Sequence, residues 1–190
     1  MSDDYDHINE EFLSLSPYII RWDRIRSITV AQPFNSDHLR VLFSQAINLR
    51  VLTLEYRSID QDRSRLKEET LIELINEKSL CNTLMSNGLK RLNLFTDWDQ
   101  SNLIDIAYLI VERLPHLQVI ELNGGNDELI EMLHIFIKGL LKLTFAILCG
   151  RYQEGSSYEK QIRSLCNSNT RSFRTEVSKN VDEDTLFVWL

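Results

Sequence analysis

The sequence predicts an α/β solenoid built from stacked strand–helix units, and three observations lead to this fold class. A short pattern with apolar residues at its first, fourth and sixth positions recurs along the 190 residues. Segments with apolar residues at helical spacing lie between its copies. The strand segments interleave polar and apolar residues, whereas the strands of a doubly wound sheet, the alternative α/β fold, are continuous apolar runs.

The apolar pattern has five copies, each of which predicts a strand. The copies occupy residues 25–30, 49–54, 89–94, 117–122 and 143–148. Their first positions are 24, 40, 28 and 26 residues apart. Because repeats in such solenoids are about 20–29 residues long, the second interval must hold an insertion of about 12 residues. The last copy is degenerate, since Ala146 takes the place of a larger apolar residue.

Helices are expected between these strands. Apolar stripes begin after Asn35, Ser101 and Asn126, which are residue types that begin helices well. The long interval also contains helical material over residues 68–84, and residues 156–159 form a capping-box pattern. The inner face of the first helix is predicted to consist of Leu39, Leu42, Phe43, Ala46 and Ile47.

A single domain over residues 1–190 is expected, because no linker rich in Gly, Ser or Pro divides the chain. An open solenoid end exposes apolar side chains and a strand edge. Residues 1–24 are therefore predicted to form an N-terminal helical cap, residues 25–177 the repeats and residues 178–190 a closing segment. Residues 173–177 form a weaker strand pattern, and the closing segment packs back as a last strand or as a closing helix.

The charge balance argues against two classes of partner. The chain has 21 basic and 28 acidic residues and a formal net charge of −7, whereas nucleic acids and anionic membranes require clustered basic residues. No apolar run is long enough to cross a membrane. The acidic first eleven residues are unlike a secretory signal, and three widely spaced cysteines favour an intracellular setting. We expect the cytoplasm, with the nucleus as the alternative compartment.

Residues with catalytic chemistry do not form a recognisable pattern. The turn at Gly124–Gly125 precedes Asp127 and Glu128, which would repel a phosphate. The four histidines are far apart, and nothing places a base beside Cys149. We therefore expect a protein that is not an enzyme, with no catalytic residue, no cofactor and no metal. A small enzyme that uses Cys149 or a carboxylate pair is kept as an alternative.

Residues 49–54, 89–94 and 114–122 resemble leucine-rich repeats of the longer, helix-containing type, as found in F-box/leucine-rich-repeat proteins. A recognisable F-box motif is not among the residues. The resemblance implies parallel strands on a concave side, helices on a convex side and a protein-binding module without catalysis. The substrate-recognition portion of an F-box-type ubiquitin ligase is one alternative function, and a truncated fragment without a role of its own is another.

A partner protein is expected on the strand face opposite the helices, because solenoids use this broad and rigid surface for binding. Strand alternation places the third, fifth and seventh pattern positions there. The predicted binding residues are Val51, Thr53, Glu55, Arg91, Asn93, Phe95, Val119, Glu121 and Asn123, with Trp98 from the loop after the third strand. Phe145 and Ile147 occupy equivalent positions in the fifth copy and either join this face or are buried by a one-residue shift.

Overall fold

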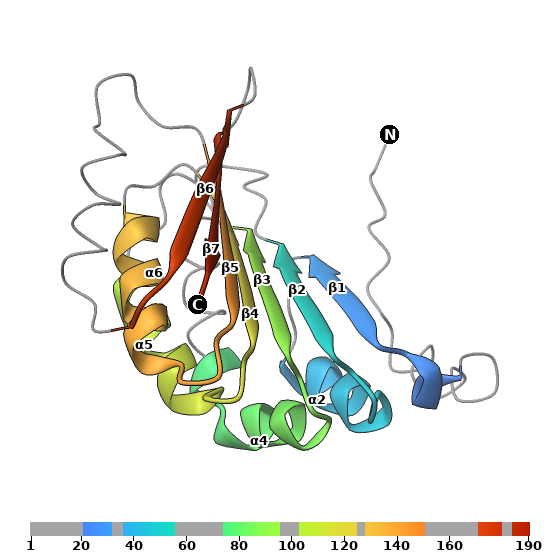
Figure 1. Cartoon of the computed structure of the whole chain (residues 1–190). Helices are drawn as coiled ribbons and strands as arrows, with labels where there is room; N and C mark the ends of the chain where they lie inside the picture. The colour runs from blue at the N-terminus through green and yellow to red at the C-terminus, as the bar shows by residue number, and fades with distance from the viewer. Residues whose placement is uncertain are drawn as a thin grey trace, which may run out of the picture.

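One seven-stranded sheet with helices against it is the central feature of the computed structural model (Figure 1). The sheet is mixed but mostly parallel, and it is not closed into a barrel, since its strand order runs β1-β2-β3-β4-β5-β7-β6. The structure describes residues 21–31, 36–55, 74–95, 103–124, 128–150, 171–179 and 184–190.

The five copies of the apolar pattern form five neighbouring parallel strands. These are β1 (Ser27–Ala31), β2 (Val51–Glu55), β3 (Arg91–Phe95), β4 (Val119–Asn123) and β5 (Phe145–Gly150). The first residue of each strand lies opposite the first residue of the next, so no pair is shifted in register. Equivalent positions of the copies therefore form straight rows across the sheet.

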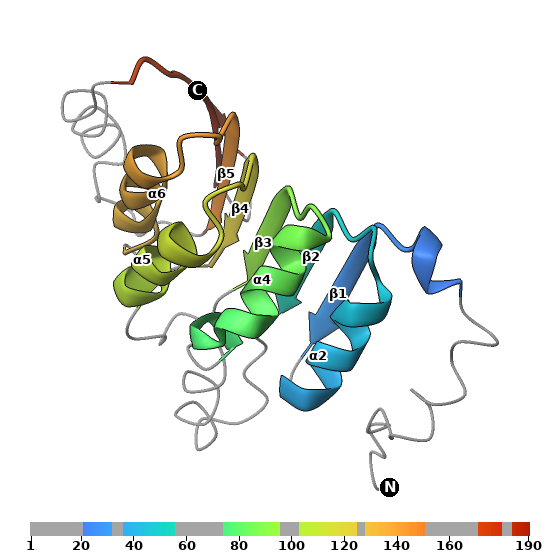
Figure 2. The same cartoon turned by 90° about the horizontal axis from the view of Figure 1, so that it is seen from below.

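The described helices lie on one side of the sheet, as Figures 1 and 2 show. They are α2 (Ser36–Gln45), α4 (Lys78–Ser86), α5 (Leu103–Arg113) and α6 (Glu128–Gly139), and a 3-10 turn, η1 (Trp22–Arg24), precedes β1. Their apolar stripes are buried: in α5, for example, Ile106, Ala107 and Ile110 are fully buried. None of these helices combines the length and the apolar character that crossing a membrane requires.

The core lies between the helices and the helix-facing side of the sheet. Every second side chain of β2–β5 points into it and is no more than 1 % exposed: Leu52, Leu54, Leu92, Leu94, Ile120, Leu122, Ala146 and Leu148. The leucines at the first pattern positions, in the turns that lead into the strands, are buried as well. Full burial of one such aliphatic side chain contributes about 1.5–3 kcal/mol to stability, so these rows stabilise the fold together with the buried stripes of the helices.

A glycine shapes the turn that leads from α4 into β3. Gly88 has a positive φ of 79°. Its N–H donates to the Met85 carbonyl at 2.9 Å, and the Leu89 N–H donates to the Leu84 carbonyl at 3.0 Å. This pair of hydrogen bonds is a Schellman motif, in which glycine is the preferred residue for the left-handed position.

Asn87, which precedes this glycine, connects α4 to the unit before it. Its side-chain amide donates to the carbonyls of Phe43 at 2.7 Å and Ala46 at 3.1 Å, both at the end of α2. The Arg50 guanidinium donates to the carbonyl of Asn87. Asn87 is buried, so these bonds satisfy a polar group that would otherwise destabilise the core.

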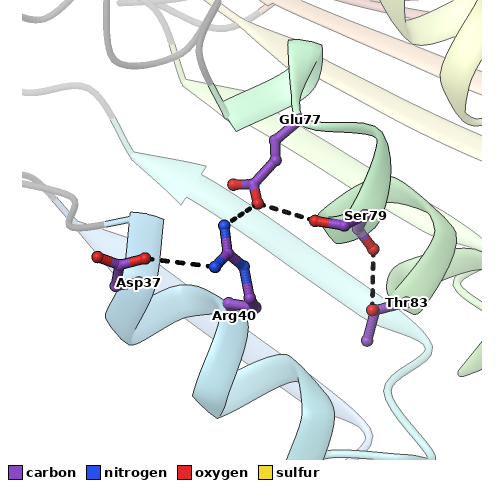
Figure 3. Close-up of polar contacts among 5 residues, drawn as sticks. All are labelled: Asp37, Arg40, Glu77, Ser79 and Thr83. Carbon is purple, nitrogen blue, oxygen red and sulfur yellow. Dashed lines mark hydrogen bonds and ion pairs between the residues drawn. The ribbon is translucent and has the colours of Figure 1, made fainter.

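A second polar link joins α2 to the start of α4 at the outer side of the helices (Figure 3). The Arg40 guanidinium pairs with the Glu77 carboxylate and lies 3.5 Å from Asp37. The Ser79 hydroxyl donates to the same oxygen of Glu77 at 2.8 Å. These bonds lower the pKa of the Glu77 carboxyl, the Ser79 bond most strongly. The link is exposed, so its contribution to stability is small.

The C-terminal end of the sheet is antiparallel. β7 (Asp184–Trp189) pairs with β5, and β6 (Arg174–Lys179) pairs with β7. The strand expected over residues 173–177 is thus present, with its start and end moved by one and two residues. The described part of the closing segment is a strand and not a helix. Its Leu186 and Val188 side chains are buried and extend the core by one more strand.

Two expectations need a correction or fall outside the described residues. Ile47 was expected on the inner face of the first helix but is 56 % exposed, because α2 ends at Gln45 and Ile47 lies in the following turn. Of the expected N-terminal cap, the structure describes residues 21–24, which contain only the short turn η1. Residues 1–20 and the capping-box pattern at 156–159 lie outside the described residues.

Candidate protein-binding face

The side of the sheet that faces away from the described helices carries the predicted binding residues, and we call it the far face. Side chains alternate along a strand, so the residues between the buried ones belong to this face. Because the register is unshifted, they form three rows. The first row is Ser27, Val51, Arg91, Val119 and Phe145, the second is Thr29, Thr53, Asn93, Glu121 and Ile147, and the third includes Glu55, Phe95, Asn123 and Cys149.

All the predicted binding residues except Trp98 lie in these rows, and Trp98 lies outside the described residues. Most of them are half-buried. Thr53 is the exception, because only 8 % of it is exposed and its hydroxyl accepts a hydrogen bond from the Asn93 side chain at 3.0 Å. Thr53 is therefore too deeply buried for broad contact with a partner, and its hydroxyl contacts the Asn93 side chain instead.

Polar side chains of β2–β4 form a connected network, which we call the polar cluster: Thr53, Arg91, Asn93, Glu121 and Asn123. Arg91 Nε donates to Asn93 Oδ1 at 2.8 Å, and the Arg91 guanidinium also pairs with the Glu121 carboxylate. Asn123 donates to the other Glu121 oxygen at 3.3 Å. A charge pair with neighbouring hydrogen bonds holds its side chains in one geometry, so this part of the far face presents fixed donors and acceptors.

Aromatic side chains gather where β5 meets the antiparallel strands, and we call this group the aromatic cluster: Phe145, Phe187, Trp189 and Arg174. The ring centroids of Phe145 lie 5.3 Å from Trp189 and 6.3 Å from Phe187, and those of Phe187 and Trp189 are 6.0 Å apart. The Arg174 guanidinium lies 5.8 Å from the Trp189 ring centroid. Trp189 remains 38 % exposed, so the cluster offers apolar surface beside a positive charge.

The register also decides between the two alternatives for the fifth copy. Phe145 and Ile147 are half-buried on the far face, whereas Ala146 and Leu148 between them are fully buried. A one-residue shift would have inverted this pattern. Both side chains therefore extend the far face beyond the predicted residues.

None of the four members of the aromatic cluster was among the predicted binding residues, and only Phe145 was considered as an alternative. Phe187 and Trp189 belong to the far face because β7 lies beside β5, with Phe187 opposite Ile147 and Trp189 opposite Phe145. The signal that could have found them is the alternation of residues 185–190, in which Leu186 and Val188 form the buried side. Arg174 carried no sequence signal, since its place depends on the pairing of β6 with β7.

The chemistry of the described cysteines and metal-ligating residues is limited. The Cys81 thiol is buried in α4, and its Sγ donates to the Ile75 carbonyl at 3.3 Å. Desolvation by burial raises the pKa of this thiol to about 11, so it is protonated at neutral pH and is a poor nucleophile. Cys149, the alternative nucleophile, lies in the third row of the far face. Within the described ranges, no three His, Cys, Asp or Glu side chains are grouped to hold a metal ion.

Comparisons with known proteins add little. No protein-family model matches the chain, and the search of curated proteins gives no match. A solved structure of an uncharacterized protein from Listeria monocytogenes serotype 4b is similar over 96 % of this chain and 68 % of its own, with 11 % identity and a TM-score of 0.32. A likeness at this level supports no conclusion about fold family or function.

Proposed function

We propose that the chain is a short leucine-rich-repeat solenoid whose far face binds another protein and catalyses no reaction. The observation that carries the proposal is the composition of that face: the aromatic cluster and the polar cluster lie on neighbouring strands of one sheet. Aromatic residues and arginine are enriched at protein interfaces and dominate their binding energy. The unshifted register and the period of the repeats support the solenoid part of the proposal.

The aromatic cluster would supply most of the affinity. Its rings already pack on one another, so little side-chain entropy is lost when a partner covers them. Trp189 is the most exposed of the three rings and is the expected anchor. The matching group on the partner is an aliphatic or aromatic side chain, with a carboxylate beside it that can approach Arg174.

The polar cluster would supply orientation more than affinity. Arg91 and Glu121 neutralise one another, so this area attracts neither sign of charge strongly and favours partners whose hydrogen-bonding groups match the fixed amides of Asn93 and Asn123. Val51 and Val119 flank Arg91 in the first row and are half-buried. They provide apolar contact that excludes water from the ion pair when a partner binds.

Photo-crosslinking tests this proposal. A photoreactive phenylalanine analogue replaces Val119 on the far face in one variant and Leu141 in a control variant, because Leu141 is 84 % exposed in the turn between α6 and β5. We expect specific crosslinked proteins from cell extract only with the Val119 variant, and their loss when Trp189→Ala is added. Equal crosslinking from both positions, or crosslinks that survive Trp189→Ala in a folded chain, would reject the far face as the binding surface.

A cytoplasmic location belongs to the same proposal. The thiol of Cys81 is free and buried, which is compatible with a reducing compartment. Fractionation of cells that produce the chain, followed by detection in the cytosolic fraction, tests this location; recovery from secreted material would contradict it.

A further inference from the structure

The two outer strands of the sheet differ in how they are protected against pairing with another chain. β6 carries Arg174, Glu176 and Lys179 along its six residues, whereas β1, with the sequence Ser-Ile-Thr-Val-Ala, carries no charge. Charged residues on an outer strand oppose edge-to-edge pairing, and uncharged β-branched residues favour it. By this criterion β6 is protected and β1 is not.

In the part of the chain that the structure describes, β1 has a neighbouring strand on one edge and none on the other. The Arg26 carbonyl accepts the N–H groups of Arg50 at 2.8 Å and Val51 at 2.9 Å. Backbone groups of alternate residues in a strand point to opposite sides, so those of Ser27, Thr29 and Ala31 point away from β2. No described strand lies on that side, because β1 ends the sheet.

The core is also less well covered at β1 than at the inner strands. Ile28 and Val30 occupy the same positions as Leu52 and Leu54, which are each 1 % exposed, yet Ile28 and Val30 are only half-buried among the described residues. Both side chains would lose water-exposed apolar surface if a further strand lay beside β1, which favours pairing.

We propose that β1 pairs antiparallel with β1 of a second copy of this chain, about a two-fold axis at Thr29. In this register Thr29 lies opposite Thr29 of the other copy, and Ser27 lies opposite Ala31. These are the residues whose backbone groups point outward, so each pair can exchange both of its hydrogen bonds. Ile28 then lies opposite Val30 on the helix side and extends the core across the axis.

Charge and symmetry favour a second copy in this orientation. Arg24 and Arg26 are exposed just before β1. Parallel pairing in register would place the two Arg26 side chains together, whereas the antiparallel arrangement separates them by roughly 20 Å along the strands. The strand is self-complementary about Thr29, with a branched aliphatic residue on each side of it. A two-fold pairing is also closed, so it yields a dimer and not a fibre.

Analytical ultracentrifugation over a range of concentrations tests the proposal, which does not depend on binding at the far face. We expect a reversible dimer, since five paired residues form a small interface. Thr29→Lys places two like charges opposite each other at the axis and should weaken dimerisation about tenfold or more, as should Thr29→Glu. Thr29 is exposed in the single chain, so neither variant should impair folding. Ser178→Lys on β6, also exposed, is the matched control and should leave dimerisation unchanged.

Mixing the two Thr29 variants gives the sharpest result. Opposite charges then face each other at the axis, so we expect a Lys–Glu heterodimer at concentrations where each variant alone is monomeric. A wild-type chain that stays monomeric at every concentration would overturn the proposal and would mean that β1 is covered from within the chain or by a different protein. A dimer that is insensitive to Thr29→Lys, or variants that do not form a heterodimer, would overturn it equally.

Discussion

The parallel part of the sheet and its antiparallel end hold their strands together in different ways. β2–β4 bury large side chains only on the helix side, and their far face is held by the hydrogen bonds of the polar cluster. β7 packs on both faces, with Leu186 and Val188 in the core and Phe187 and Trp189 in the aromatic cluster. β7 thus has apolar contacts on both of its faces, and the side chains that stabilise this antiparallel end of the sheet also form the apolar part of the far face.

The largest loss of stability is expected when a core side chain is removed from the parallel part of the sheet. Leu92→Ala, at a position that is 1 % exposed, should lower the free energy of unfolding by about 2–5 kcal/mol, because it loses buried apolar area and leaves a cavity. Urea unfolding followed by circular dichroism measures the loss. Leu141→Ala, at an exposed turn position, is the control and should change stability little. Similar losses for the two variants would mean that burial in the leucine rows contributes little to stability.

The next effect concerns Gly88, in the turn between α4 and β3. Gly88→Ala should lower the free energy of unfolding by about 1–3 kcal/mol, since alanine is strained at a φ of 79°. Its Cβ would also collide with the Arg50 guanidinium. The same substitution in an Arg50→Ala background removes the collision and leaves only the backbone strain. If the cost of Gly88→Ala is the same in both backgrounds, the collision contributes nothing.

A smaller loss is expected at the antiparallel end. Trp189→Ala should lower the free energy of unfolding by about 1–2 kcal/mol, because the ring is partly exposed but contacts Phe145 and Phe187. The near-ultraviolet circular dichroism of the folded chain should weaken as well. Val177→Ala on β6 has a partly exposed side chain outside the cluster and serves as the control. A negligible cost for Trp189→Ala would show that the cluster is available for binding without stabilising the end.

The polar cluster should contribute less than the aromatic cluster to stability. In a double-mutant cycle of Arg91→Ala and Glu121→Ala, we expect a coupling energy of about 0.5–1 kcal/mol, since Arg91 is partly exposed to solvent. Urea unfolding of the four chains gives this value. A coupling above that of a Phe187–Trp189 cycle would reverse the proposed difference between the two clusters.

The smallest effect lies on the helix side, away from both clusters. Ser79→Ala should raise the pKa of the Glu77 carboxyl towards its ordinary value, because the Ser79 hydrogen bond is the largest single cause of the lowered pKa. Arg40→Ala should raise it as well, since this variant removes both the hydrogen bond and the charge of Arg40. Carboxyl chemical shifts from NMR titrations measure both. Because the pKa of Glu77 is lower in the folded chain than in the unfolded chain, the ionised carboxylate stabilises the fold at pH values above its ordinary pKa. This stabilisation is lost as the pH falls through the lowered pKa of the folded chain. An unchanged Glu77 pKa in the Ser79→Ala variant would contradict the assignment of the largest cause to the Ser79 hydrogen bond.

The parallel rows could be predicted from the sequence because their cause is local. Each copy repeats the same alternation, so Leu52, Leu92 and Ile120 were expected in equivalent buried places, and they are buried. The burial of Thr53 could not be predicted, since it depends on the amide of Asn93 in the neighbouring strand. Ile47 fits a helical stripe equally well whether the helix reaches it or ends two residues before it.

The antiparallel end was harder to predict because strand direction is a tertiary property. Buried and less buried residues alternate along 185–189 as in any half-buried strand. This alternation does not indicate whether the strand pairs parallel or antiparallel with β5, or that β6 pairs with the other edge of β7. The aromatic cluster follows from that pairing. The part of the far face that was missed is therefore the part that depends on contacts between distant segments.

The buried thiol of Cys81 can be used to measure local opening of the structure around α4. A protonated sulfur inside the core cannot react with an alkylating reagent until the packing around α4 opens. With Cys149 and Cys166 replaced by serine, the rate of alkylation would measure how often this opening happens, without a bound probe or a denaturant. The same measurement on Asn87→Ala would report how far one buried amide between α2 and α4 keeps two successive units from separating.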